Sequence, residues 1–218
     1  MATMPSSRVG QASDVAPKVF VIDDDHGLRN SLGRLLRSVG LDAELFASVP
    51  DFFESHRLDE AGCLVLDVRL PGQSGLDLQR DLIAANLKMP IIFITGYGDI
   101  PMSVQAMKGG AIEFLTKPFR EQDLLDAIRL GLDRDRARRE AESLNNELKE
   151  RFEKLSLRER EIMIQVARGR LSKQIAGDFG ISEATVKVHR SNLMRKMKVR
   201  SLAELIRITD KLDLIGPS

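Results

Sequence analysis

The chain has 218 residues, 43% of them hydrophobic and 30% charged, which suits a globular protein of one large domain or two average ones. A single cysteine, Cys63, lies in an apolar run; it excludes a disulfide framework, fits a reducing cytoplasm and is expected to be a small buried residue. No apolar run approaches the roughly 20 residues that span a bilayer, and residues 1–17 lack a signal-peptide core, so we expect a cytoplasmic protein with a disordered tail over residues 1–17 and no membrane partner.

The net charge of +1 conceals an asymmetry along the chain. Residues 1–150 carry 18 Lys and Arg against 24 Asp and Glu, a balance of −6, whereas residues 151–218 carry 15 against 8, a balance of +7. An acidic first part joined to a basic last third predicts two domains, the second of which faces a polyanion.

From Lys18 onward, short β-rich runs alternate with helical patterns. The strand candidates are Val19–Asp23, Ala43–Phe46, Cys63–Asp67, Ile91–Thr95 and Glu113–Lys117. Nearly continuous apolar strands that alternate with helices indicate a parallel sheet covered on both faces. The predicted fold class of this part is therefore α/β, with a doubly wound five-stranded parallel sheet.

A long helical pattern runs from about Glu121 to Lys154. Its first apolar positions, Leu124, Ile128 and Leu132, are spaced to pack on the sheet. Further along, apolar residues continue in a field of Arg and Glu for about two heptads, with Arg151 interrupting the register: Ala137, Ala141, Leu144, Leu148 and Leu155. This segment is either a short parallel coiled coil or a solvated linker helix.

Polar side chains stand at the ends of four of the five strand candidates. They are Asp23, Asp24 and Asp25 after the first, Asp67 after the third, Thr95 after the fourth and Lys117 after the fifth. An acid alone is common at a strand end, but an open parallel sheet binds ligands at the carboxyl edge of its strands, where these groups would converge. Clustered carboxylates resist ionisation unless a cation lies among them, and their hard oxygen atoms suit Mg²⁺.

Residues Lys18 to Leu132 resemble the receiver domain of two-component response regulators, which has a flavodoxin-like fold with strand order 2-1-3-4-5. The resemblance rests on the doubled acid Asp23-Asp24, the lone Asp67 followed by a Pro-Gly loop, Thr95, and Lys117-Pro118 with its usual cis peptide. It implies that Asp67 accepts a phosphoryl group from a kinase histidine.

The same resemblance implies roles for the surrounding residues. Asp23, Asp24, Asp67 and the backbone carbonyl of Arg69 would hold Mg²⁺, while Thr95 and Lys117 would contact the phosphoryl oxygens. Phe114 occupies the position of the family's aromatic switch residue. Asp67 is a weak nucleophile, so catalysis would consist mainly of positioning and charge neutralisation.

A phosphatase of the haloacid-dehalogenase type is an alternative, because Asp23-x-Asp25 fits its nucleophile motif. That family needs an acidic pair at a strand end after the lysine, whereas here the acids that follow lie on a helix, and Gly27 stands where the motif takes Thr or Val. Asp67 would also have no role. We therefore predict no enzyme activity beyond self-catalysed phosphotransfer and dephosphorylation at Asp67.

The basic third of the chain has clear helix boundaries. A capping box at Ser156–Glu159 opens one helix, which Gly169 ends, and a second helix over Ser172–Phe179 ends at Gly180. Ser182 caps a third helix from about Glu183 to Met197, and a fourth helix begins near Ser201 or Leu202. This part is predicted to be a small all-α domain.

The spacing within SKQIAGDFGISEATVKVHRSNLMRKM is that of a helix-turn-helix. Ala176, Gly180 and Val186 lie four, eight and fourteen residues after Ser172, where close helix approach, a turn and a core anchor are needed. Val186, Leu193 and Met197 share one helix face and should be core. The opposite face fits a DNA major groove and carries Ala184, Lys187, Val188, Ser191 and Arg195.

Residues Leu155 to Leu212 resemble the LuxR/NarL-type DNA-binding domain through LSLRERE, GRLSKQIAGDFGIS and TVKVHRSNLMRKM. By that resemblance, Lys187, Val188 and Ser191 would reach base edges, although several relatives carry a basic residue at the place of Ser191. The predicted phosphate contacts are Lys173, Thr185, Arg190, Arg195 and Lys196. His189 has no nearby His or Cys partner in the sequence and is not predicted to bind metal.

Together these patterns predict a response regulator of the FixJ/NarL type: receiver at 18–132, helical linker at 133–154 and helix-turn-helix domain at 155–218. The loop TGYGDIPMSVQAMKGGA is similar to the FixJ branch. Expected partners are a sensor histidine kinase, promoter DNA, a second copy of the phosphorylated chain and RNA polymerase. The alternative is a constitutive DNA-binding protein whose receiver serves as a dimerisation scaffold; the complete acid set favours the phosphorylated regulator.

Overall fold

The computed structural model describes residues 16–55 and 57–214, which form two compact units divided between Arg138 and Arg139. The division falls inside the predicted linker. The predicted tail lies outside the described residues except for its last two positions. Across the described ranges, no helix has both the length and the apolar character needed to cross a membrane.

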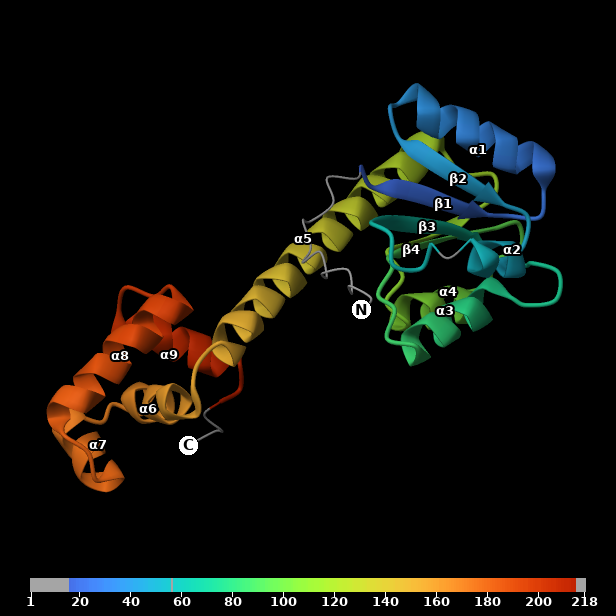
Figure 1. The fold of residues 1–218 in the computed structure, drawn as a ribbon. Helices are drawn as coiled ribbons and strands as arrows, with labels where there is room; N and C mark the ends of the chain where they lie inside the picture. The colour runs from blue at the N-terminus through green and yellow to red at the C-terminus, as the bar shows by residue number, and fades with distance from the viewer. Residues whose placement is uncertain (1–15, 56, 215–218) are drawn as a thin grey trace, which may run out of the picture. The chain divides into compact units, whose positions relative to one another are not determined.

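The first unit contains a five-stranded parallel sheet in the order β2-β1-β3-β4-β5 (Figure 1). The strands are β1 (Lys18–Ile22), β2 (Asp42–Phe46), β3 (Gly62–Asp67), β4 (Ile91–Thr95) and β5 (Glu113–Thr116). Each predicted strand is confirmed to within one residue at either end, and the predicted α/β class and strand order are confirmed as well.

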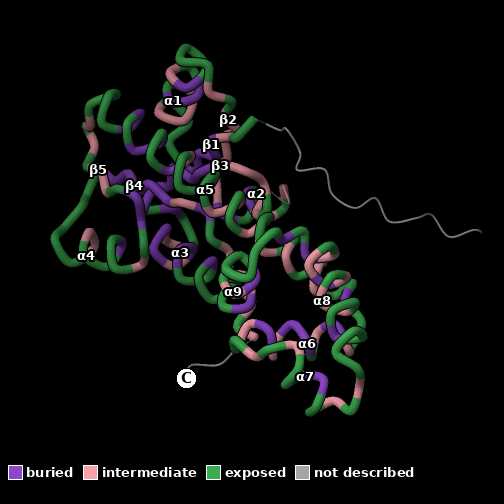
Figure 2. The backbone as a smooth tube through the Cα atoms, turned by 90° about the vertical axis from the view of Figure 1, so that its left-hand side faces the viewer, coloured by how far each residue is buried: buried purple, intermediate pink, exposed green. Residues whose placement is uncertain are grey.

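Five helices cover the two faces of this sheet. They are α1 (His26–Ser38), α2 (Val49–Glu54), α3 (Gly75–Ala84), α4 (Ile100–Lys108) and α5 (Glu121–Glu153). Alternate strand residues enter two separate cores, because side chains of a strand point in turn to opposite faces. Phe20 belongs to the core that includes residues of α2, α3 and α4, whereas Val21 belongs to the core that includes residues of α1 and α5. The buried strands appear as the purple interior in Figure 2.

Helix α5 has the predicted extent, and Leu124 and Ile128 are buried against the sheet as expected. Of the later apolar positions, Leu144 is exposed, whereas Leu155 is buried in the core of the second unit. Arg151, which interrupts the heptad register, donates to the carbonyl of Met197 at 3.5 Å within that unit. For the part of α5 around the exposed Leu144, the coiled coil and the solvated linker helix stay alternative predictions.

The second unit is all-helical, as predicted; after the end of α5 it contains α6 (Leu157–Ala167), α7 (Ser172–Phe179), α8 (Glu183–Met197) and α9 (Leu202–Lys211). The predicted capping box of Ser156 and Glu159 is present. Gly180 ends α7 with φ of +64°, a left-handed conformation that glycine adopts without steric cost. The core includes Val186, Leu193 and Met197, the three residues predicted for it.

Candidate functional site

The structure brings the predicted acids together at the carboxyl edge of the sheet. Strands β1 and β3 are neighbours in register, so Asp23 and Asp67 emerge side by side. Both are buried, whereas Asp24 is exposed. One carboxylate oxygen of each of the three residues lies within 4.8 Å of the others. We call Asp23, Asp24 and Asp67 the acid cluster.

Lys117, one residue beyond β5, reaches into the acid cluster. Its Nζ lies 2.7 Å from Oδ2 of Asp23 and 2.6 Å from Oδ2 of Asp67. Its main-chain N donates to the carbonyl of Thr95 at 2.7 Å, which fixes the residue beside the end of β4, and its peptide bond to Pro118 is cis, as predicted. One ammonium group therefore bridges the two buried carboxylates.

The charges of the site are strongly coupled. Burial raises the pKa of Asp23, and the hydrogen bonds from Lys117 and the Asp25 amide offset part of that increase. Burial lowers the pKa of Lys117, but its hydrogen bonds to Asp23 and Asp67 outweigh this and raise the pKa overall. Two acids that lie this close together ionise more readily when positive charge is near them, so the site favours a cation in addition to Lys117.

The residues present fit a Mg²⁺ ion. Ligands about 2.1 Å from an octahedral Mg²⁺ stand at most about 4.2 Å apart, and the acid cluster offers one carboxylate oxygen from each residue within 4.8 Å of the others. Because Asp24 is exposed, the acid cluster is open to solvent on that side. Asp23, Asp24 and Asp67 are the residues that would hold such an ion.

The third acid of the triplet has a different role from its neighbours. The Oδ1 atom of Asp25 accepts hydrogen bonds from the amides of Gly27 at 2.7 Å and Leu28 at 3.0 Å, so this residue is the N-cap of α1. These bonds lower the pKa of Asp25. They also fix the turn that holds Asp23 and Asp24 at the sheet edge.

Arg29 is a site neighbour that sequence reasoning missed. Its Nη1 donates to the carbonyl of Asp23 at 2.5 Å from the second turn of α1, and so braces the β1–α1 turn. A lone arginine in a helical pattern is only a weak signal of such a contact. Arg29 follows the N-cap residue Asp25 by four residues, about one helical turn, and this spacing could have suggested that its side chain reaches back to the turn before the helix.

The remaining predicted residues lie around Asp67. Thr95 is buried, and its hydroxyl accepts a hydrogen bond from the Tyr97 amide at 3.3 Å. The Arg69 amide donates to Oδ1 of Asp67 at 2.9 Å, and its guanidinium lies 4.8 Å from the centre of the Tyr97 ring. Phe114 is half-buried. The metal-binding role of the Arg69 carbonyl and the switch role of Phe114 remain predictions.

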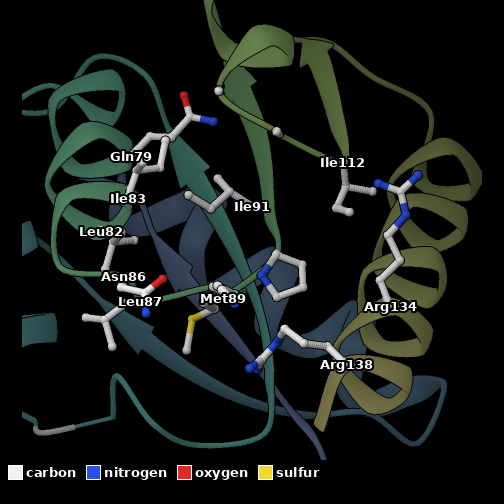
Figure 3. A pocket seen from close by; sticks show the side chains of 14 residues that line it. Gln79, Leu82, Ile83, Asn86, Leu87, Met89, Ile91, Ile112, Arg134 and Arg138 are labelled. Atoms are coloured by element: carbon white, nitrogen blue, oxygen red, sulfur yellow. The ribbon is translucent and has the colours of Figure 1, made fainter. Parts of the chain in front are cut away.

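A separate hollow of about 380 Å³ lies at the opposite edge of the sheet, by the start of β4 (Figure 3). Gln79 and Ile83 of α3 line one side, and Arg134 and Arg138 of α5 line the other. Its lining includes no carboxylate. It is therefore distinct from the acid cluster, which lies where the strands end.

In the second unit, the predicted DNA-binding side chains lie on α7 and α8. Most are exposed, namely Lys173, Thr185, Lys187, Val188, Ser191 and Arg195, whereas Arg190 and Lys196 are partly buried. Val188 stands out as an aliphatic side chain with 59% exposure on a helix whose opposite face is core.

Lys196 differs from the other predicted phosphate contacts. Its Nζ lies 2.6 Å from Oε2 of Glu159, a carboxylate on α6 whose side chain is only 5% exposed. Burial would raise the pKa of Glu159, but the hydrogen bonds from Lys196 and the Ser156 amide outweigh it and lower the pKa. Glu159 was predicted as part of a capping box, and its link to α8 was missed.

Because the pKa of Glu159 falls below its ordinary value of 4.5 on folding, we expect its stabilising effect to be present above that pH and to disappear as pH falls through the folded pKa. Amide-hydrogen exchange of α8 peptides in the full chain, corrected for intrinsic rates, should show protection that decreases as pH is lowered below 4.5. Glu159→Gln should remove that pH dependence. The exposed Glu161→Gln is the control, and an unchanged pH profile in Glu159→Gln would contradict the assignment.

Two family models of known proteins match the chain, one in each of its two parts. Residues 19–129 match the model of the response regulator receiver domain, and residues 153–209 match that of bacterial regulatory proteins of the luxR family. Receiver domains generally bind Mg²⁺ in an acidic pocket, and the acid cluster has that character.

Similar proteins extend over nearly the whole chain. Nodulation protein W from Bradyrhizobium diazoefficiens is 53% identical over 196 residues, covering 90% of this chain and 86% of its own. Response regulator protein TodT from Pseudomonas putida is 50% identical over 200 residues, covering 92% and 88%.

Two solved structures are similar over most of the chain. The response regulator StyR is 51% identical with a TM-score of 0.84, covering 90% of this chain and all of its own. Full-length FixJ from B. japonicum is 36% identical with a TM-score of 0.55, covering 92% and 98%. With a receiver fold, an acid cluster and a LuxR-type helix-turn-helix in one chain, the protein belongs to the two-component response regulators of the FixJ/NarL family, which control transcription in response to phosphorylation.

Proposed function

We propose that Asp67 accepts a phosphoryl group from the phosphohistidine of a sensor kinase. The observation that carries this proposal is the position of Lys117, whose Nζ contacts both Asp67 and Asp23. A carboxylate oxygen of Asp67 attacks phosphorus, the bond from phosphorus to the histidine nitrogen breaks, and the imidazole leaves with the electron pair. The same site hydrolyses the acyl phosphate, and the chain acts on no other substrate.

The surrounding residues supply charge and orientation for this transfer. Asp23, Asp24, Asp67 and the Arg69 carbonyl would hold a Mg²⁺ ion, which would supply positive charge opposite the phosphoryl oxygens. Lys117 stays within reach of the same oxygens, because it is anchored to β4 through the Thr95 carbonyl. The Thr95 hydroxyl then bonds a phosphoryl oxygen, and Phe114 changes its packing in response.

The second unit binds promoter DNA by placing α8 in the major groove. Lys187, Val188 and Ser191 contact base edges, and phosphates are contacted by Lys173, Thr185, Arg190 and Arg195. Phosphorylation shifts the receiver towards a form that pairs with a second copy, so that two α8 helices read two half-sites. RNA polymerase is a further partner, and the cytoplasm is the compartment where kinase and DNA are both reached.

Intact-mass measurement of the full chain after incubation with Mg²⁺ and acetyl phosphate tests the receiver half. The wild type should gain one phosphoryl group that hydroxylamine removes, and Asp67→Asn should gain none. Omitting Mg²⁺ should strongly reduce labelling. A labelled Asp67→Asn variant would show that another residue is the acceptor.

Two other outcomes would support the alternatives. No adduct in the wild type, together with intact DNA binding, would make the receiver a scaffold. Sustained phosphate release from phosphomonoesters that survives Asp67→Asn but disappears in Asp23→Asn would favour the phosphatase mechanism.

A further inference from the structure

The last turn of α8 is held by two polar contacts from outside the helix. Lys196 donates to Glu159 of α6 at 2.6 Å, and Arg151 of α5 donates to the carbonyl of Met197 at 3.5 Å. Both contacts lie at the same end of the helix that presents Lys187, Val188 and Ser191. The last turn of α8 is therefore held by one residue of α5 and one of α6.

Glu159 is fixed independently of Lys196. Its Oε2 accepts from the Ser156 amide at 2.8 Å, and its own amide donates to Oγ of Ser156 at 3.2 Å. With 5% of its side chain exposed, the carboxylate is largely shielded from water. The capping box thus gives Lys196 a rigid anchor.

Arg195, the next residue, provides a direct contrast. It is exposed, and its guanidinium donates to Oδ1 of Asn192 within the same helix at 3.3 Å. An exposed contact of this kind is worth little and exchanges easily for a phosphate. Moving Lys196 to a phosphate would instead leave the buried carboxylate of Glu159 without its cation, which is costly.

We propose that Glu159 and Lys196 form a positioning pair that sets the angle of α8 on DNA, and that Lys196 does not neutralise a DNA phosphate. This proposal rests on the proposed function, in which α8 enters the major groove. It replaces the phosphate-contacting role that the family resemblance implies for Lys196. Base discrimination depends on side-chain placement, so a loosened last turn should weaken recognition of the correct site more than general affinity.

Salt dependence separates the two roles. Each neutralised phosphate contributes about 0.9 to the slope of log K against log salt on duplex DNA. The full chain would be measured over a range of salt concentrations on two probes: a duplex enriched by the wild type from a random-sequence pool, and a scrambled duplex of equal length. The variants are Lys196→Met and Arg195→Met, which remove the same charge from adjacent positions.

We expect Lys196→Met to keep the wild-type salt slope while the affinity ratio between the two probes falls about tenfold, within the range expected for one lost base contact. Arg195→Met should weaken both probes alike and reduce the slope by about 0.9. Lys196→Arg should retain discrimination, because the pair is preserved. A slope decrease of about 0.9 in Lys196→Met, with discrimination retained, would overturn the proposal.

A charge-balanced variant guards against misfolding. Glu159→Gln retains an oxygen that can accept from the Ser156 amide, and Glu159→Gln/Lys196→Met leaves no buried charge unpaired. The effects of the two single changes on discrimination should be far from additive in this double variant, as expected for a coupled pair. Additive effects would contradict the pair. Absence of salt-dependent binding by the wild type would overturn the proposed DNA-binding function itself, whereas the slope result in Lys196→Met overturns the positioning role alone.

Discussion

Replacing Lys117 with methionine should slow phosphorylation of Asp67 by about 10²- to 10³-fold, the loss typical of removing one preorganised charge-stabilising donor. The Nζ of Lys117 is within 2.7 Å of carboxylate oxygens of both Asp23 and Asp67, so it is already placed where negative charge accumulates in the transfer. Methionine keeps most of the volume and removes the charge. The rate of adduct formation with acetyl phosphate and Mg²⁺, followed by intact mass, measures the effect.

The same change should alter the resting site. The hydrogen bond from Lys117 lowers the pKa of Asp23 and so opposes the effect of burial. Without the ammonium group, the pKa of Asp23 should rise further above its ordinary value. Lys108→Met is the matched control, because Lys108 is exposed at the end of α4 and its loss changes the net charge equally. A wild-type labelling rate in Lys117→Met would show that the contact is structural rather than catalytic.

Replacing Gly75 with alanine should destabilise the receiver by about 3 kcal/mol, at the upper end of the range for overpacking. A Cβ at Gly75 would lie 2.4 Å from the main-chain oxygen of Asp67 and 3.0 Å from Cγ of Leu66. Backbone atoms cannot move aside as a flexible side chain can, so the start of α3 must shift away from β3. Amide-hydrogen exchange of β3 peptides should become about 100-fold faster, since each 1.4 kcal/mol is a factor of ten.

Gly96→Ala is the control for this substitution. Gly96 follows Thr95 at the same edge of the sheet, but a Cβ there would meet nothing within 4 Å. Its exchange should stay close to that of the wild type. Wild-type protection in Gly75→Ala would mean that α3 adapts to the extra methyl group, and normal labelling of Asp67 would then be expected as well.

Much of the fold follows from local patterns. Apolar strands that alternate with amphipathic helices allowed all five strands to be placed to within one residue, because only a parallel sheet covered on both faces buries such runs. The capping box at Ser156 and the turn at Gly180 likewise mark helix boundaries through interactions between near neighbours. These features need no knowledge of distant contacts.

The convergence of the candidate site was also predictable, because the carboxyl ends of parallel strands share one edge. The different contacts that its acidic residues make were not predictable from the sequence. Asp25 caps α1, whereas Asp23 turns towards Lys117, which lies 94 residues away in the sequence. A residue before a helix can cap it or face a neighbouring strand, and only the packed turn determines which of the two occurs.

The sequence by itself determined the order of the elements and the set of chemical groups at the sheet edge. Tertiary structure alone decided how the cations are shared: Lys117 between two buried carboxylates, Arg29 on the Asp23 carbonyl and Lys196 on Glu159. The physical reason is that a long cationic side chain can reach several partners, and the partner it takes depends on burial and distance across elements that are remote in sequence.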